Sequence, residues 1–450
     1  MATSTLSASA EVVSEKLNFK KILPIFVIVL IDLLGLTIII PLMPLYATAF
    51  GASPLLIGVL GAAYPVMQFI GAPLLGRLSD RYGRKPVLLI SQLGTFVGFV
   101  ILGLANSLWM LFLARVLDGI SGANISTAQA AISDSTTEKT RTQGLGLVGA
   151  AFGIGFILGP IIAFVSLAAS GNNYHVPAFV AAGFSLTSIL LTWFWFEETL
   201  PRELRQAKAK KPPFTLSAMI EAVRHPAVGF LLVLIFAQQI AFGGFEQLLA
   251  LFTLNRLGLN ASGNAIIFVF VGLIVVAVQG GLIGRWSRKY GERRLILAGL
   301  ATLAIGLTLT AFTPHQPMPF YSKAALQAEL QGSGTFRTHE NPTTQNLTIA
   351  IPDDNQKGWF GLGWLLVAMI PAAVGGGILQ PSINSLISQK TRKDEVGGLL
   401  GISAAFLSGA NAIAPLVGGL IFQAWGSTAP FLIFGLVMAI LLSLALIYIK

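Results

Sequence analysis

The sequence predicts an all-α integral membrane protein with twelve transmembrane helices in two pseudo-symmetric six-helix bundles. Three observations support this: the composition, twelve long apolar segments, and a basic motif that occurs twice. Hydrophobic residues make up 54% of the 450 positions and charged residues only 11%, which is too apolar for one water-soluble core. The chain has no cysteine, which excludes disulfides and thiolate metal sites.

Twelve segments are long enough to cross a bilayer, which takes about 20 mainly apolar residues at a rise of about 1.5 Å per residue. The predicted spans are 22–48, 53–76, 85–105, 107–132, 143–168, 177–196, 227–255, 261–284, 293–312, 359–388, 397–423 and 427–449. The apolar run from Ile22 is too long for a signal-peptide core, so we expect a retained first helix. The even number of spans places both termini on the same side.

The distribution of positive charge predicts the orientation. Of the 29 Lys and Arg residues, 24 fall in the termini and the loops on their side, four fall on the opposite side, and Arg115 falls in a helix. Because positive loops stay cytoplasmic, we expect a multi-pass protein of the plasma (inner) membrane with both termini in the cytoplasm. The net charge of +10 then suits membrane topology and anionic headgroups rather than nucleic acid. We expect contact with the lipid bilayer, no nucleic-acid partner, and a monomer.

Changes in composition predict the domain organisation. We expect a cytoplasmic tail at 1–21, a first bundle at 22–196, a polar and proline-interrupted cytoplasmic linker at 197–226, a second bundle at 227–450, and within it an extracytoplasmic loop at about 314–358. Two glycosylation sequons, at Asn346 and Asn260, fall on the outer face. Sequons often arise by chance, and we expect the loop to be solvated without a dedicated role.

One motif stands between the second and third spans and returns between the eighth and ninth. It reads Gly76-Arg-Leu-Ser-Asp80-Arg81-Tyr-Gly83-Arg84-Lys85, and about 208 residues later Gly284-Arg-Trp-Ser-Arg-Lys-Tyr-Gly291-Glu-Arg-Arg294. We interpret each copy as a short cytoplasmic loop. The repetition indicates a duplicated six-helix unit, an architecture typical of transporters.

The first copy of this motif resembles the signature of the major facilitator superfamily, and three further motifs agree with it. The first span contains Ile31-Asp32-Leu-Leu-Gly35 followed by Pro41-Leu-Met-Pro44, which resembles the pattern of twelve-helix drug:proton antiporters. The fourth contains Arg115-Val-Leu-Asp118 and continues through Asn124 to Asp134, which is similar to the tetracycline-resistance branch. The fifth contains Gly155-Phe-Ile-Leu-Gly159-Pro160, similar to a motif of exporters, and the eleventh carries Pro415.

The resemblance implies the major facilitator fold and a gating role for the motif Gly76, Asp80, Arg81, Gly83 and Arg84. It implies that Asp80 meets the positive end of the eleventh helix, a helix-dipole contact between the halves that Gly76 and Gly83 allow. It also implies that Arg84 pairs with Asp134 and stabilises the outward-facing state.

Four ionisable residues lie well inside the predicted spans: Asp32, Arg115, Asp118 and Glu246. Each costs roughly 2.5–3.5 kcal/mol at the bilayer centre if it stays charged and unpaired. Arg115 and Asp118 are three residues apart on one helix, so they form either a structural ion pair or part of the proton-coupling site. Asp32 has no cation near it in sequence and is the best candidate for the proton carrier, with a permanently protonated, hydrogen-bonded carboxyl as the alternative. The resemblance implies that Arg115 approaches Asp32.

Glu246 lies among aromatic residues on the seventh helix, a combination that suits a cationic, lipophilic ligand. Its predicted depth is the outer third of the membrane, where a rim or gate contact is the alternative. Further intramembrane hydrogen-bonding groups either bind substrate or join helices, and these are Asn124, Gln129, Gln238, Gln239, Gln279, Gln380 and Asn384.

These observations predict a proton-coupled secondary active exporter of small amphipathic organic molecules or drugs, working by alternating access without a cofactor. An importer of a sugar or other small metabolite is the alternative, disfavoured by Gly159-Pro160. A non-transporting membrane receptor on the same fold is disfavoured by Asp32 and Arg115. We do not expect an enzyme, since the sequence contains no metal-ligand motif, serine–histidine arrangement or phosphate loop. The histidines are predicted to lie in loops, at His175, His225, His315 and His339.

Overall fold

The computed structural model describes residues 19–136, 140–203, 205, 221–225, 228–332, 349–391 and 396–449, and its regular elements are helices. Most of the predicted tail 1–21, most of the predicted linker 197–226, and the positions His339 and Asn346 lie outside these residues. Twelve helical segments of the described chain are long and apolar enough to cross a membrane. The predicted fold class is therefore confirmed.

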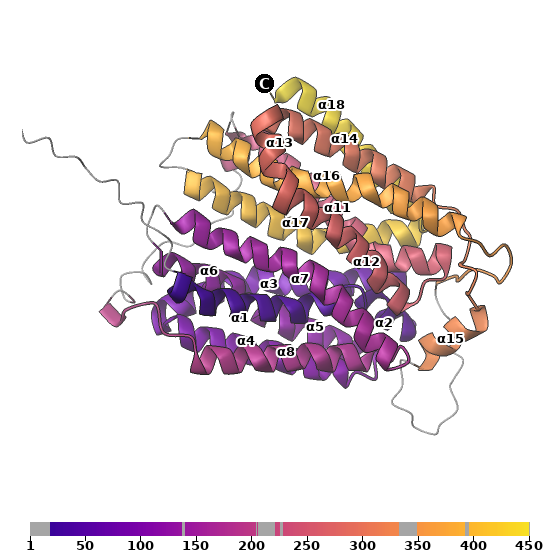
Figure 1. Ribbon diagram of the computed structural model, residues 1–450, viewed down its shortest axis with the longest axis horizontal. Coiled ribbons are helices and arrows are strands. Elements are labelled where there is room, and N and C mark those ends of the chain that lie inside the picture. Colours follow the sequence, from indigo (N-terminus) through magenta and orange to yellow (C-terminus); the bar gives the residue numbers. More distant parts are fainter. Residues whose placement is uncertain are drawn as a thin grey trace, which may run out of the picture.

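The helices form two halves, which Figure 1 shows one above the other. The N-terminal half contains α1 Phe19–Ile39, α2 Met43–Ala49, α3 Pro54–Tyr82, α4 Arg84–Gly103, α5 Leu108–Ser121, α6 Asn124–Asp134, α7 Arg141–Ala169 and α8 His175–Phe194. The C-terminal half contains α11 Gly229–Leu257, α12 Ala261–Val276, the π-helical η1 Ala277–Leu282, α13 Ile283–Tyr290, α14 Glu292–Ala311, α15 Lys323–Gly332, α16 Phe360–Lys390, α17 Val396–Trp425 and α18 Ala429–Tyr448. The halves meet where α3 packs on α17 and α7 packs on α12.

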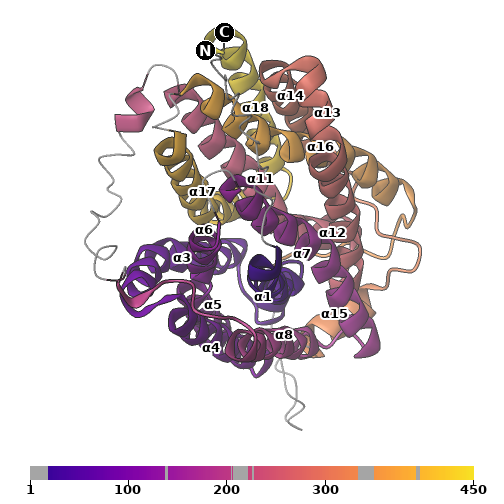
Figure 2. The same cartoon turned by 60° about the vertical axis from the view of Figure 1, so that its left-hand side comes forward.

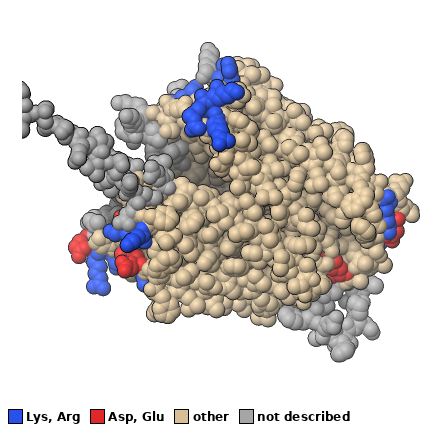
Figure 3. Space-filling view, in the orientation of Figure 1, with Lys and Arg blue, Asp and Glu red and all other residues tan. Residues whose placement is uncertain are grey.

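Charged side chains gather toward the two ends of the molecule and leave an uncharged band between them on the face in Figure 3. We call one end the basic end; it carries Arg77, Arg81, Arg285 and Arg288. Figure 2 brings this end forward and shows α1 beside α7 and α8. We call the other the α15 end. The uncharged band matches the hydrocarbon layer that the helices would cross.

Two predicted spans are interrupted. The first divides into α1 and α2 at Pro41, because proline has no N–H to continue the helical hydrogen bonds. The fourth divides into α5 and α6 at Gly122, whose carbonyl oxygen accepts a hydrogen bond from Gln68 Nε2 at 3.1 Å. Gly122 also lines the cavity that contains Asp32.

The repeated motif is almost entirely helical, so its interpretation as a loop is wrong. Residues 76–82 form the last turns of α3, and only Gly83, with φ +109°, separates α3 from α4. In the second copy only Gly291, with φ +78°, separates α13 from α14. Glycine reaches these dihedrals without the steric cost of a Cβ, so a single residue suffices for each turn. The loop assignment of His175 is also wrong, because His175 is the buried first residue of α8.

The two halves touch at the α15 end. The backbone N–H of Leu55 in α3 donates to Gln423 Oε1 in α17 at 3.0 Å. Near the middle of α7 the halves are also in close contact, since a Cβ on Gly272 of α12 would lie 2.8 Å from the carbonyl oxygen of Phe156. Toward the basic end α7 and α12 diverge. A Cβ on Gly153 would lie 3.7 Å from Val276, and a Cβ on Gly149 would meet no described atom within 4 Å. The structure is therefore open at the basic end and closed at the α15 end.

Candidate functional site

The Asp32 carboxyl lies near the middle of the first span, in the interior of the N-terminal half. Asn124 Nδ2, at the start of α6, donates a hydrogen bond to Asp32 Oδ2. None of the ion pairs between described residues involves Asp32. Asp32 also lines a cavity of about 30 Å³, room for a water molecule. The cavity therefore leaves room for one water molecule beside the Asp32 carboxyl.

Arg115 pairs with Asp118 rather than with Asp32. Arg115 Nη1 lies 2.9 Å from Asp118 Oδ2, and both side chains are buried. The guanidinium stands 4.5 Å from the centre of the Tyr64 ring, so a cation–π contact adds to the ion pair. Asp118 lines the same cavity as Asp32, which makes this pair a neighbour of the candidate proton carrier. The approach of Arg115 to Asp32 is not among the described ion pairs.

Several polar residues around Asp32 were missed by the sequence analysis. Tyr64, Gln92 and Thr95 line the cavity with Asp32, and Gln92 Nε2 donates to Ser188 Oγ of α8 at 2.8 Å. Gln92 and Ser188 are fully buried. The sequence did contain a signal for these residues, because amide and hydroxyl side chains that are buried in a membrane span need hydrogen-bond partners. Their spacing in sequence did not indicate which ones would meet.

Glu246 lies in α11 about three residues, or roughly 4.5 Å, from the midpoint of the helix at Gly243, and its depth in the membrane stays a prediction. Within the described residues Glu246 has neither an ion pair nor a hydrogen bond. On the same helix, Gln239 Nε2 donates to Asn411 Oδ1 of α17 at 2.7 Å. Aromatic contacts surround this region, with Phe236 against Phe406 and Phe242 against Phe245. The site residue Asn411 was also missed.

The remaining polar candidates fall into two groups. Gln238 is fully buried, Gln380 is half-buried, and Asn384 Oδ1 accepts a hydrogen bond from Ser403 of α17 at 2.7 Å. Gln129 and Gln279 are exposed, and Gln279 belongs to the π-helical η1. A role in substrate binding stays a prediction for all five. Asn124 joins the Asp32 network instead of standing alone.

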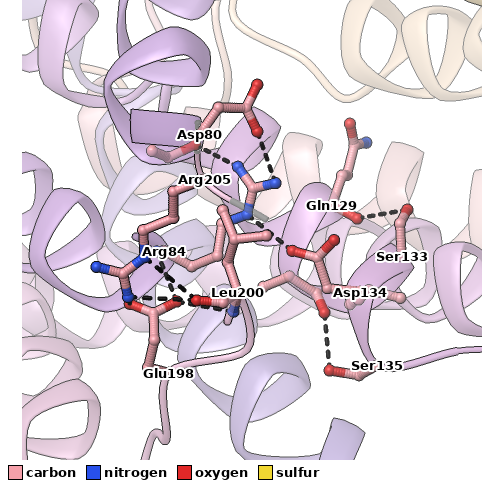
Figure 4. A network of polar contacts seen from close by, with 12 residues as sticks. Asp80, Arg84, Gln129, Ser133, Asp134, Ser135, Glu198, Leu200 and Arg205 are labelled. Atoms are coloured by element: carbon pink, nitrogen blue, oxygen red, sulfur yellow. Dashed lines mark hydrogen bonds and ion pairs between the residues drawn. The ribbon is translucent and has the colours of Figure 1, made fainter. Parts of the chain in front are cut away.

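Arg84 is the centre of a polar network at the basic end (Figure 4). It lies 2.8 Å from Asp80 Oδ1 and 2.9 Å from Asp134 Oδ2, and Nη1 donates to Ser79 Oγ at 2.6 Å. The structure thus brings Arg84 and Asp134 together, as the resemblance implies, but does so with the basic end open, so the pair is not confined to the outward-facing state. Asp80 is engaged by Arg84 here, and its contact with the start of α17 stays a prediction for another conformation. Arg81 is exposed and stands over the Tyr82 ring.

Glu198 caps α4, a role the sequence analysis did not anticipate. Its carboxylate accepts hydrogen bonds from the backbone N–H groups of Arg84 at 2.9 Å and Lys85 at 3.2 Å. A carboxylate at a helix N-terminus satisfies free N–H donors and the positive end of the dipole. A Cβ on Gly83 would clash with this carboxylate. The glycine is therefore needed for the cap as well as for the turn.

The predicted exporter motif packs α7 directly onto the helix of Asp32. A Cβ on Gly155 would lie 3.5 Å from Leu33, and one on Gly159 would clash with Thr37. Pro160 follows within α7. In the other half, Pro415 of α17 lies so close to α3 that its Cβ would be 3.1 Å from a Cβ on Gly61. These small residues let helices approach closely, as is typical of membrane bundles.

Comparisons with known proteins give the family. The model of the Major Facilitator Superfamily matches residues 25–358 and 347–450. The class B tetracycline resistance protein of Escherichia coli is 29% identical over 400 residues, covering 88% of this chain and 87% of that protein. Multidrug resistance protein 2 of Bacillus subtilis (strain 168) is 30% identical over 288 residues, covering 62% and 71%.

Among solved structures, the human organic anion transporter MFSD10 (TETRAN) superposes with a TM-score of 0.62 at 22% identity, covering 95% of this chain and 99% of that one. At this identity the likeness supports the fold alone. The family model, in contrast, matches nearly the whole sequence. This chain belongs to the major facilitator superfamily.

Proposed function

We propose that this protein is a proton-coupled exporter of small amphipathic organic molecules that works by alternating access between its two halves. The observation that carries the proposal is the half-buried Asp32 carboxyl near the middle of the first span, which has no ion pair among the described residues and borders a cavity with room for water. Such a group must be neutral or hydrated, because an unpaired charge there is costly. Its protonation therefore depends on the conformation, which is what coupling requires.

The similarity to tetracycline and multidrug resistance proteins supports export rather than import. An exporter of drug-like molecules needs an apolar site with few polar contacts. The region of α11 around Glu246 fits this description, with phenylalanines and one carboxyl that has no partner among the described residues. In our proposal Glu246 attracts a cationic substrate, while Asp32 carries the proton in the opposite half. We propose that Arg115 and Asp118 adjust the protonation of Asp32 across the shared cavity.

We further propose that the basic end faces the cytoplasm and that the protein resides in the plasma membrane as a monomer. The divergence of α7 and α12 at that end then corresponds to an inward-open state, ready to receive substrate from the cytoplasm. The absence of native cysteine makes sidedness easy to test. Tyr82→Cys at the basic end should react with an impermeant maleimide only after cell lysis, whereas Phe320→Cys should react in intact cells, since both side chains are exposed. The reverse pattern would contradict the orientation.

The coupling role is tested with Asp32→Asn, which imitates the protonated carboxyl. In inverted vesicles with an imposed pH gradient, wild-type protein should accumulate a tetracycline or a lipophilic cation such as ethidium. The variant should still exchange substrate down its own gradient, while accumulation against the gradient is lost. Asp353→Asn, which changes an exposed carboxylate paired with Lys323, is the control and should behave as wild type. Accumulation by Asp32→Asn at the wild-type level would place the proton site elsewhere, with Asp118 as the next candidate.

A further inference from the structure

Helix α15 belongs to the predicted outer loop, yet it is anchored to the transmembrane domain. Leu326 and Leu330 are buried in the main hydrophobic core, although the helix lies beyond the end of the bundle (Figure 1). The helix packs against α2 of the N-terminal half. An element of the C-terminal half therefore crosses to its partner half at the closed end. The expectation that the whole loop is solvated is therefore wrong for α15.

Glu329 is the polar anchor of α15. Its Oε2 accepts hydrogen bonds from Asn172 Nδ2 at 3.1 Å and from Asn260 Nδ2 at 3.0 Å, and its Oε1 accepts one from the Tyr174 hydroxyl at 3.3 Å. The carboxylate is half-buried. Asn172 and Tyr174 lie between α7 and α8, whereas Asn260 caps α12. One side chain thus receives donors from both halves of the protein.

A second contact joins the α7–α8 connection directly to the start of α12. Ser262 Oγ of α12 donates a hydrogen bond to Asn172 Oδ1. Asn260 and Ser262 are the two defining residues of the outer sequon, and both are occupied by this cluster. Asn260 also accepts from the backbone N–H of Gly263 at 3.0 Å. These residues act in the closed end of the structure rather than as a free glycosylation acceptor.

We propose that Glu329 is a gating residue, which holds the two halves together at the α15 end and must release Asn172 and Tyr174 when that end opens. The inference rests on the proposed alternating-access cycle. All the Glu329 contacts with the N-terminal half come from one short segment, so a small separation of the halves breaks them together. The contacts with Asn260 lie within the C-terminal half and survive the separation. Glu329 therefore adds stability to this conformation selectively.

The test uses a single reporter cysteine in the cysteine-free chain. Ala47→Cys places it in α2, where Ala47 is buried and α2 packs on both α11 and α15. Alkylation by a maleimide is followed on purified protein in nanodiscs, so neither orientation nor transport affects the result. Glu329→Ala should accelerate labelling about tenfold, which corresponds to about 1.4 kcal/mol. Gln327→Ala, on the same helix, is the matched control and should leave the rate unchanged.

Three companion variants make the outcome decisive. Glu329→Gln keeps an acceptor for both asparagines and a donor for Tyr174, so its labelling rate should stay close to wild type. Asn172→Gly removes one of the two N-terminal partners of Glu329, together with the acceptor of Ser262, while tolerating the positive φ of 60° at this position, and should also accelerate labelling. The effects of the two single variants should combine to less than their sum in the double variant, because both remove the Glu329–Asn172 hydrogen bond, while each removes one further contact, with Tyr174 and Ser262 respectively.

The proposal is overturned if Glu329→Ala labels no faster than Gln327→Ala, or if the two single effects add. A second reporter, Ala181→Cys, is buried where α8 faces Gly35 of α1, within the N-terminal half. It should stay unlabelled in every variant. Labelling of Ala181→Cys as fast as Ala47→Cys would mean that Glu329 supports the fold and not the gate. The labelling assay contains no substrate. A failure of the proposed drug export would therefore not affect its result.

Discussion

Arg84 and Glu292 occupy the same position in the two copies of the repeated motif, with opposite charges. Each directly follows a glycine with positive φ, and each is hydrogen bonded to the serine five residues before it. Arg84 Nη1 donates to Ser79 Oγ at 2.6 Å, and Ser287 Oγ donates to Glu292 Oε1 at 2.6 Å. Arg84 also contacts Asp134 in the fourth span of the N-terminal half. Glu292 contacts Ser385 in α16, which is the fourth span of the C-terminal half. The repeat has preserved the geometry of this turn while reversing its charge.

The turn before Arg84 should depend on glycine. Gly83→Ala forces a Cβ into a positive-φ conformation and against the Glu198 carboxylate, so we expect a loss of about 1–3 kcal/mol in stability. Gly76→Ala is the matched control, because its added Cβ meets no described atom within 4 Å. Thermal unfolding of purified protein followed by fluorescence measures both. Equal melting temperatures for the two variants would contradict the role of Gly83.

Arg84 and Asp134 should act as one unit. Removing Arg84 takes away the ion pair of the mostly buried Asp134 carboxylate, with an expected cost of roughly 3 kcal/mol, whereas Asp134→Ala costs less because Arg84 keeps Asp80 and Ser79. The double variant should be no less stable than Arg84→Ala alone. Melting temperatures and transport rates of the three variants complete the cycle. Additive losses would mean that the two residues act independently.

Glu246 should discriminate between substrates by charge. Glu246→Gln keeps the size of the side chain and removes its charge, so binding of a lipophilic cation should weaken by tenfold or more while a neutral analogue of similar size is little affected. Binding is measured by fluorescence titration of purified protein. Gln247→Glu, on the adjacent residue, provides a charge-added comparison. An equal loss for both ligands would indicate a structural role for Glu246.

The α15 end should respond to pH through Glu329. Burial raises the pKa of Glu329 above its ordinary value of 4.5, although hydrogen bonds from Asn260, Tyr174 and Asn172 oppose this. The closed state therefore binds the proton more tightly than a solvated open state. This contribution to closure is fully present below pH 4.5 and is lost as the pH rises through the raised pKa. Burial also raises the pKa of Tyr174, so its hydroxyl stays protonated throughout.

The measurement is the labelling rate of Ala47→Cys with a dithiodipyridine reagent, which reacts with thiols in acid. The rate should increase with pH in this window relative to the same reporter with Glu329→Gln, whose side chain does not titrate. If the ratio of the two labelling rates did not change with pH, Glu329 would not be responsible for the pH response.

The fold was predictable because its main signals are local. Apolar length identifies a span wherever it occurs, and the repeated motif identified the duplication. Interruptions were harder to place. Pro41 was visible within the first span, but Gly122 breaks the fourth span because Gln68 and Tyr64 of another helix lie against it. Such a break depends on tertiary contacts that no local pattern contains.

The candidate site was predictable where an unusual residue stands alone. Asp32, Arg115 and Asp118 were found because charges are rare in membrane spans. Their partners Tyr64, Gln92 and Ser188 are ordinary residues whose importance comes only from proximity. Glu198 and Glu329 lie in segments that read as solvated, so their hydrogen bonds could not be foreseen from composition.

Helix α7 is in close backbone contact with a helix on each side. On one side Gly155 and Gly159 place its backbone directly against α1, one turn beyond Asp32, and on the other side the Phe156 carbonyl lies against Gly272 of the opposite half. No long side chain, which could change rotamer and absorb a displacement, separates these backbones. A shift of α1 by a fraction of an ångström would therefore be passed on to the C-terminal half. Even one added methyl group at either contact would push the two helices apart and change the relative position of the two halves.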